Sequence, residues 1–154
     1  MAGSIEKSVH IEAPVELVWR TVTQPDQVVR WFADEIDLQA TPGYEGSMIF
    51  RPESGGTVHV PITVESVEAP RRFTYRWSHP AGTVATPANS TLVEFTLTAE
   101  EGGTRLRVVE TGHDAVGWPE DQQNAFVDDH NDGWSMHLGR LEQLFARRSA
   151  DAAR

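Results

Sequence analysis

The sequence predicts an α+β domain in which a curved antiparallel sheet of about six to seven strands surrounds one long C-terminal helix. Residues 5–111 form short runs of alternating apolar and polar residues, separated by glycine and proline turns, which are typical of β-strands. Residues 119–148 instead carry apolar side chains at three- and four-residue steps, the period of an amphipathic helix. These apolar residues are Phe126, Val127, Trp134, Leu138, Leu141, Leu144 and Phe145. A strand-rich body followed by one long helix favours a sheet folded over that helix, with a packed core or a ligand cavity between them.

The start of the chain predicts one strand followed by two short helices. Residues 4–12 alternate between apolar and polar and are expected to form the first strand. Pro14 suits the first turn of a helix. That helix has an apolar stripe formed by Val15, Val18, Trp19 and Val22. A second helix is predicted over residues 26–32, and the two helices can close one end of a curved sheet.

Six further strands are expected, at residues 35–40, 47–51, 58–64, 72–78, 90–99 and 104–111. Pro61 cannot donate a ladder hydrogen bond, so it predicts an edge position or a bulge. Residues 112–118 are expected to form a linker that acts as a mobile entrance, and residues 149–154 a frayed tail. The length predicts a single domain, residues 1–154.

Composition excludes several classes of partner. The formal net charge of −10 disfavours nucleic acids and anionic membranes, because both repel an acidic surface. No apolar run approaches the roughly 18 residues of a membrane span, so no membrane insertion is expected. The chain lacks cysteine, which excludes disulfides and thiolate chemistry. The first residues lack the apolar stretch of a secretory signal, and we expect a cytoplasmic protein.

Motifs for cofactors and metals are missing. The sequence contains no Gly-rich phosphate loop, no G-x-S-x-G elbow and no H-E-x-x-H pair, so no cofactor is predicted. His130, Trp134 and His137 share one helix face, but histidines seven residues apart are separated by about 10 Å. They are too far apart to bind one metal ion, so no metal site is predicted. We expect one histidine to form a hydrogen bond in or near the cavity and the other to meet solvent.

Glu110 is the candidate catalytic residue. Leu106, Val108 and Glu110 alternate along the last predicted strand, so Glu110 points into the cavity if the strand continues. A buried carboxylate needs a partner or takes up a proton, and either outcome is useful for binding or acid–base chemistry. If the strand ends at Val109, Glu110 is instead solvated. Gly133, in the middle of the helix, is expected to allow a close approach to the sheet or to a ring.

Four stretches of the chain resemble the START-like (SRPBCC) superfamily with its helix-grip fold, and within it the family of the C-terminal domain of the Hsp90 ATPase activator. They are IEAPVELVWRTVTQPDQVVRWF at residues 11–32, VEAPRRFTYRW within 64–77, LVEFTLTAEEGGTRLRVVETG at 92–112 and GWSMHLGRLEQL at 133–144. Together these stretches cover nearly the whole chain, and their order and spacing carry the resemblance. The family's namesake has a separate N-terminal domain, for which this chain has no room, so we expect no chaperone-activating role.

The resemblance implies a deep apolar cavity between the sheet and the C-terminal helix. Superfamily members bind lipids, hormones or polyketides there, and a few catalyse cyclisation or dehydration. We therefore expect a small hydrophobic ligand, aromatic or lipid-like, bound by a monomer or homodimer that is not an enzyme. The residues expected around the ligand are Trp31, Phe32, Phe50, Trp77, Glu110, Trp134, His137 and Leu141.

Two other functions stay open. One is an enzyme of the cyclase, aromatase or dehydratase type that uses Glu110 as general acid or base, with His137 or Tyr75 nearby. The other is a protein-interaction or stress-related accessory module that acts through an apolar surface patch.

Overall fold

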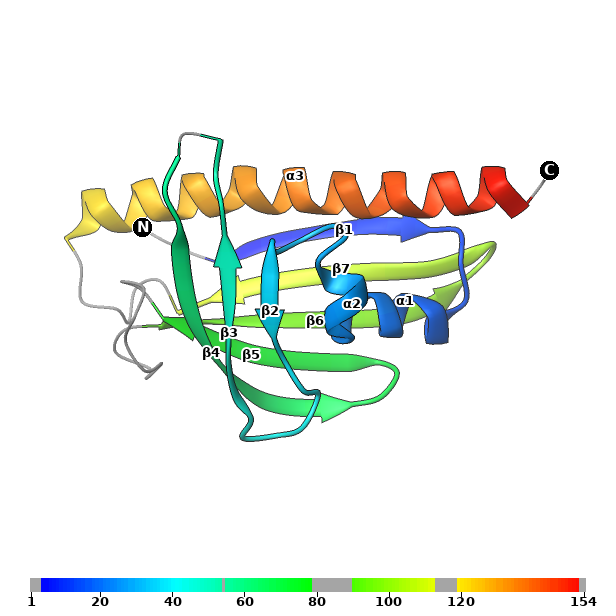
Figure 1. Ribbon diagram of the computed structural model, residues 1–154, viewed down its shortest axis with the longest axis horizontal. Helices are drawn as coiled ribbons and strands as arrows, with labels where there is room; N and C mark the ends of the chain where they lie inside the picture. Colours follow the sequence, from blue (N-terminus) through cyan, green and yellow to red (C-terminus); the bar gives the residue numbers. More distant parts are fainter. Residues whose placement is uncertain (1–3, 54, 79–89, 113–118, 153–154) are drawn as a thin grey trace.

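The computed structural model describes residues 4–53, 55–78, 90–112 and 119–152 (Figure 1). Its strands pair antiparallel in one seven-stranded sheet of order β1-β7-β6-β5-β4-β3-β2, which confirms the predicted α+β architecture. The long helix α3 runs beside the sheet, and the β3–β4 hairpin rises past it. The elements are β1 (Ile5–Ile11), α1 (Val15–Thr23), α2 (Pro25–Val28), β2 (Glu35–Asp37), β3 (Glu45–Phe50), β4 (Val58–Glu68), β5 (Arg72–Ser78), β6 (Ser90–Glu100), β7 (Gly103–Thr111) and α3 (Glu120–Ala152).

The two faces of the sheet differ in chemistry because strand side chains alternate between them. Strand β7 buries Thr104, Leu106, Val108 and Glu110 and turns Arg105 and Arg107 outward. The outer face carries ion pairs, and these include Arg107–Glu6, Arg105–Glu100, Arg72–Glu94 and Arg76–Glu65. The inner face carries aromatic and aliphatic side chains, so the inner face and the helices enclose the core.

Helix α3 buries the second half of the predicted stripe. Trp134, Leu138, Leu141 and Phe145 are at most 4% exposed, at spacings of three and four residues. Val127 and Leu144 are only partly buried against the core. The helix continues to Ala152, beyond the predicted end at residue 148. None of the described helices combines the length and apolar character needed to cross a membrane.

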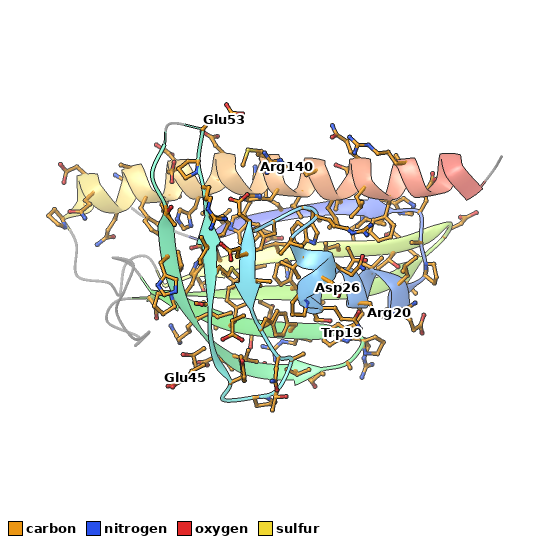
Figure 2. All side chains as sticks on the ribbon, viewed as in Figure 1. Trp19, Arg20, Asp26, Glu45, Glu53 and Arg140 are labelled. Atoms are coloured by element: carbon orange, nitrogen blue, oxygen red, sulfur yellow. The ribbon has the colours of Figure 1, made fainter. Side chains whose placement is uncertain are left out.

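The second short helix is shorter than predicted. Helix α2 ends at Val28, and residues 29–32 form a turn instead of the helix expected to residue 32. Trp31 and Phe32 are both buried, at 2% and 6% exposure. The turn carries both rings into the core, where Phe32 stacks on Trp31 and on Trp134. On the preceding helix, Trp19 (Figure 2) packs edge-on against Phe73, with ring centroids 6.3 Å apart.

The strands around Pro61 explain how a proline fits this sheet. Pro61 pairs with Ser47 of β3, but pairing between β4 and β5 begins only at Ile62, opposite Trp77. Within the described residues Pro61 is thus paired on the β3 side only, but β4 lies between β3 and β5, so the predicted position in an edge strand is wrong. The bulge lies further on, between Val64 and Ser66, and β4 extends to Glu68 beyond the predicted end at residue 64. Strand β2 is shorter than expected and ends at Asp37.

We expect Gly46→Ala to lower the free energy of unfolding by about 1–3 kcal/mol, as overpacking does in dense structures. A Cβ at Gly46 would lie 2.0 Å from the carbonyl oxygen of Asp37, so β2 would have to move. Gly139→Ala is the matched control, because a Cβ there meets nothing within 4 Å. It should raise stability by about 0.5–1 kcal/mol through helix propensity. Urea unfolding measures both, and equal effects of the two substitutions would contradict the packing argument.

Candidate functional site

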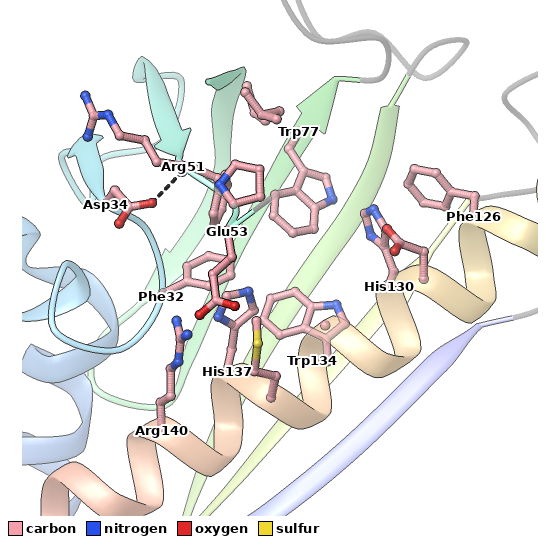
Figure 3. A pocket seen from close by; sticks show the side chains of 17 residues that line it. Phe32, Asp34, Arg51, Glu53, Trp77, Phe126, His130, Trp134, His137 and Arg140 are labelled. Atoms are coloured by element: carbon pink, nitrogen blue, oxygen red, sulfur yellow. Dashed lines mark hydrogen bonds between the residues drawn. The ribbon is translucent and has the colours of Figure 1, made fainter. Parts of the chain in front are cut away.

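A cavity of about 770 Å³ lies between the β3–β4 hairpin and helix α3 (Figure 3). Strand side chains form one wall, helix side chains form the other, and Phe32 enters from the turn after α2. The lining residues are Phe32, Asp34, Phe50, Arg51, Pro52, Glu53, Val58, Val60, Trp77, Phe126, Asp129, His130, Gly133, Trp134, Met136, His137 and Arg140. The cavity is thus aromatic along its walls and carries charged side chains at its margin.

The aromatic wall is a continuous set of ring contacts centred on Phe32. Its ring stacks on Trp31 on one side and on Trp134 on the other, with centroids 5.1 and 5.2 Å apart. His137 meets the same ring edge-on at 4.8 Å, and Trp77 lies 5.6 Å from Trp134. Such contacts hold ring orientations more tightly than aliphatic packing does. The wall is therefore formed before any ligand arrives.

Glu110 lies behind this wall and is completely buried. Its carboxylate accepts hydrogen bonds from the indole nitrogen of Trp134 at 2.9 Å and that of Trp77 at 3.2 Å. The hydroxyl of Thr91 donates at 2.6 Å, and Nδ1 of His130 lies 2.9 and 3.0 Å from the two carboxylate oxygens. One carboxylate thus joins side chains from β5, β6 and α3. Glu110 lies on the inner face of β7, and the solvated alternative is wrong because β7 continues to Thr111. The prediction that it points into the cavity is not met, because Glu110 is not among the lining residues.

The neighbours of Glu110 differ from those expected for an acid–base pair. Its titratable partner is His130, whereas neither Tyr75 nor His137 forms a hydrogen bond with it. The Tyr75 hydroxyl is buried and has no hydrogen-bond partner in the described part of the chain. Burial, and then the negative charge of Glu110, raise the pKa of Tyr75 well above its usual range. Tyr75 is therefore a neutral core residue, and its hydroxyl does not act on Glu110 because the two form no hydrogen bond.

His137 is the second histidine of the cavity and has a different environment. Its Nδ1 atom is buried and has no hydrogen-bond partner among the described residues. Burial lowers the pKa of His137 to about 4, while the backbone of Trp31 acts in the opposite direction. The ring is thus neutral at pH 7, with one nitrogen as donor and the other as acceptor.

The margin of the cavity carries both signs of charge. Arg51 pairs with Glu35, and its backbone N–H donates to Asp34 at 2.5 Å (Figure 3). Arg140 also lines the margin, close enough to His137 for its charge to lower that pKa further. Within the described ranges, no three His, Cys, Asp or Glu side chains converge as a metal site would require.

The structure separates the eight predicted site residues into two groups. Five line the cavity, and these are Phe32, Phe50, Trp77, Trp134 and His137. The other three, Trp31, Glu110 and Leu141, are buried behind it. Sequence reasoning did not identify Arg140, although its spacing of three residues from His137 places it on the same helix face.

Two expectations about α3 are wrong. One histidine does form a hydrogen bond beside the cavity, namely His130 with Glu110, but the other does not meet solvent as expected, because His137 also lines the cavity. Gly133 does not allow a close approach, because a Cβ there would meet nothing within 4 Å. It faces the open cavity instead. Of the predicted linker, residues 113–118 lie outside the described residues.

We expect Glu110→Gln to lower the free energy of unfolding by about 2–4 kcal/mol. The N–H groups of the introduced amide would face the donors that now contact the buried carboxylate, and His130 would lose its carboxylate partner. Glu94→Gln is the matched control, since Glu94 pairs with Arg72 on the outer face. An exposed pair contributes about 1 kcal/mol or less. Chemical unfolding of both variants tests this, and similar losses for the two would show that the Glu110 contacts stabilise no more than a surface pair.

The lowered pKa of His137 predicts how stability depends on pH. Between pH 6.5 and pH 4 the unfolded chain binds a proton at this histidine that the folded protein does not. The free energy of unfolding should therefore fall as pH falls through this window, by up to about 3 kcal/mol, and be unaffected by His137 above it. His137→Gln removes this contribution, so the stability difference between wild type and variant should change over that range only. Parallel profiles for the two proteins would contradict the lowered pKa.

Comparison with solved structures identifies the same fold in bacterial proteins. Protein MLL2253 from Mesorhizobium loti is 26% identical, with a TM-score of 0.73 over 94% of this chain and 97% of that one. DynU16, a protein of the dynemicin biosynthetic locus, is 27% identical with a TM-score of 0.71 over 91% of this chain. The match spans only 46% of DynU16. The Aha1 dimer from Colwellia psychrerythraea shares the fold at 20% identity, with a TM-score of 0.70 over 92% of this chain and 95% of that one.

Curated protein sequences give no match to the chain. A family model does match, and it covers residues 12–146. Its description is activator of Hsp90 ATPase homolog 1-like protein. The matched region contains the cavity walls, Glu110 and the buried part of α3. The chain therefore belongs to the family of proteins like activator of Hsp90 ATPase homolog 1.

Proposed function

We propose that this protein binds a small hydrophobic molecule, aromatic or lipid-like, in the cavity between the β3–β4 hairpin and α3. The observation that carries the proposal is the cavity itself, about 770 Å³ in volume and walled by the rings of Phe32, Phe50, Trp77, Phe126 and Trp134. Ligand pockets range from about 300 to 1,000 Å³ and are mostly apolar, with a few placed polar groups. The likeness to a protein of a biosynthetic locus supports a small molecule as the occupant.

His137 supplies one polar group that can orient the ligand. A neutral imidazole with a buried nitrogen that lacks a partner costs free energy, and a hydrogen bond from a ligand would recover part of it. The ring already meets Phe32 edge-on, so its plane is fixed. A ligand with a hydroxyl, carbonyl or amide beside an apolar body fits this arrangement.

Exposed apolar side chains also gather at the cavity. Among the described residues, the exposed large hydrophobic side chains are Val29, Val58 and Met136. Two of these, Val58 and Met136, line the cavity. They favour an entrance for an apolar ligand over a separate docking patch, so the protein-interaction hypothesis gains no comparable support. A cytoplasmic location and a monomeric or dimeric state stay predictions.

A second candidate function is catalysis of the cyclase, aromatase or dehydratase type. The observation that favours it is the contact between Glu110 and His130, because His130 lines the cavity and a carboxylate behind it fixes the ring. A histidine held in this way can act as general acid or base. Native mass spectrometry of protein from its host identifies a retained molecule. Conversion of that molecule by wild type, lost in His130→Gln, would favour catalysis over binding alone.

We expect Gly133→Leu to weaken binding of the neutral fluorescent dye N-phenyl-1-naphthylamine by about tenfold or more. Gly133 lines the cavity and has open space around its Cβ direction, so a leucine there would occupy ligand volume. Gly139→Leu adds the same side chain to the same helix outside the cavity, and should bind as wild type does. Dye titration measures both. No binding by wild type, or equal binding by the two variants, would contradict the proposed site.

A further inference from the structure

A second hollow, of about 260 Å³, adjoins the cavity through Arg140, which lines both. Its other lining residues are Arg30, Gln143, Leu144 and Arg147. Arg30 comes from the turn that also carries Phe32, and the rest lie further along the same helix face as His137. The cavity and this arginine hollow are therefore successive compartments between one turn and one helix.

No acidic side chain is among the residues that line the arginine hollow. Its three arginines form no ion pair within the described residues, and its other two lining residues are uncharged. Five other arginines of the described chain pair with glutamates, namely Arg51, Arg72, Arg76, Arg105 and Arg107. Arg20 and Arg71 also lack ion pairs there, but they lie outside the hollow. The chain has 23 acidic against 13 basic residues, so carboxylates are plentiful. The arginine hollow is distinguished by three guanidinium groups and no carboxylate among its lining residues.

The helix dipole does not explain this placement. Helix α3 ends at Ala152, and the favourable field at a C-terminus falls off within the last turn. Arg140 lies more than three turns before that end, and Arg147 more than one. Figure 3 shows Arg140 rising from α3 beside His137 at the margin of the cavity. The arginine nearest to the cavity is therefore the one that the dipole helps least.

We propose that the ligand is a small hydrophobic molecule that carries an anionic group such as a carboxylate, sulfonate or phosphate. Its apolar body occupies the aromatic cavity, and its anion is held by Arg140 together with Arg30 and Arg147. This inference rests on the proposed function and specifies the ligand class. Guanidinium groups present paired donors that match such anions. Because the whole protein is strongly acidic, an anion needs a local cationic site of this kind to bind.

Two dyes of the same skeleton test the inference. N-phenyl-1-naphthylamine is neutral, and 8-anilinonaphthalene-1-sulfonate adds one anionic group. Wild type should bind the sulfonate more tightly than the neutral dye, and Arg30→Gln/Arg147→Gln should reduce that preference by about fivefold or more. The measured quantity is the ratio of the two dissociation constants, because a general disturbance of the cavity changes both alike.

Arg20→Gln/Arg71→Gln is the matched control. It removes the same net charge from two exposed arginines that also lack ion pairs in the described chain and lie outside both hollows (Figure 2 labels Arg20 on α1). The dye ratio should stay at the wild-type value. Thermal unfolding of each variant confirms that it is folded.

The outcomes separate the inference from the function on which it rests. Equal affinity of wild type for the two dyes, or a ratio that changes as much in the control as in the test variant, overturns the inference but leaves hydrophobic binding intact. Failure of both dyes to bind overturns the two proposals together. Inorganic phosphate is titrated alone as a third arm. Weak binding of phosphate supports the inference that the anionic group must be attached to an apolar body. Tight binding of phosphate shows that the arginines form a site for free anions, which overturns the inference.

Discussion

The structure of the cavity depends on the buried carboxylate of Glu110. Four side chains donate to it or share a proton with it, and two of them are the indoles of Trp77 and Trp134 that wall the cavity. An indole N–H buried without an acceptor costs about 1–3 kcal/mol, so Trp134 depends on the carboxylate for its position. The N–H of Trp77 is also accepted by the Thr91 hydroxyl at 2.8 Å, and Thr91 itself donates to Glu110. The same contacts attach α3 to the sheet through His130. One carboxylate thus sets both the position of the helix and the orientation of the rings.

This attachment also explains why the space beside the rings stays open. A packed interior normally closes around voids, because atoms that line a gap lose dispersion contacts. Here the rings that could collapse into the space are fixed from behind by hydrogen bonds, and Phe32 is stacked between two of the tryptophans. Gly133 contributes no side chain where one would fit. The cavity is maintained by the buried hydrogen bonds that Glu110 accepts from the tryptophans of its wall.

The strand and helix periods of the sequence predicted which face each of these side chains occupies. They could not predict which side chains form hydrogen bonds with one another. The two-residue period placed Glu110 on the inner face, and the helical period placed Trp134 and His137 on one stripe. The partner of Glu110 depends on how far α3 slides along the sheet, which no local pattern encodes. Likewise α2 ends at Val28, earlier than the local pattern predicts, and the turn that follows carries Trp31 and Phe32 into the core. The same turn carries Arg30, which lines the hollow that Arg140 also lines.

The two histidines of α3 show how one helix face can present different chemistry at the two ends of a cavity. His130 lies against a carboxylate, whereas His137 lies near the positive charge of Arg140 and has its pKa lowered mainly by burial. Two helical turns, about 10 Å, separate them. The rings of Phe32 and Trp134 occupy the space between. A molecule that fills the cavity therefore meets the imidazole of His130, which contacts the carboxylate of Glu110, and also the apolar rings beside it. It further meets the neutral imidazole of His137, which lies near the guanidinium group of Arg140. The different polar groups beside the two histidines favour a ligand with two distinct polar ends over a purely apolar one.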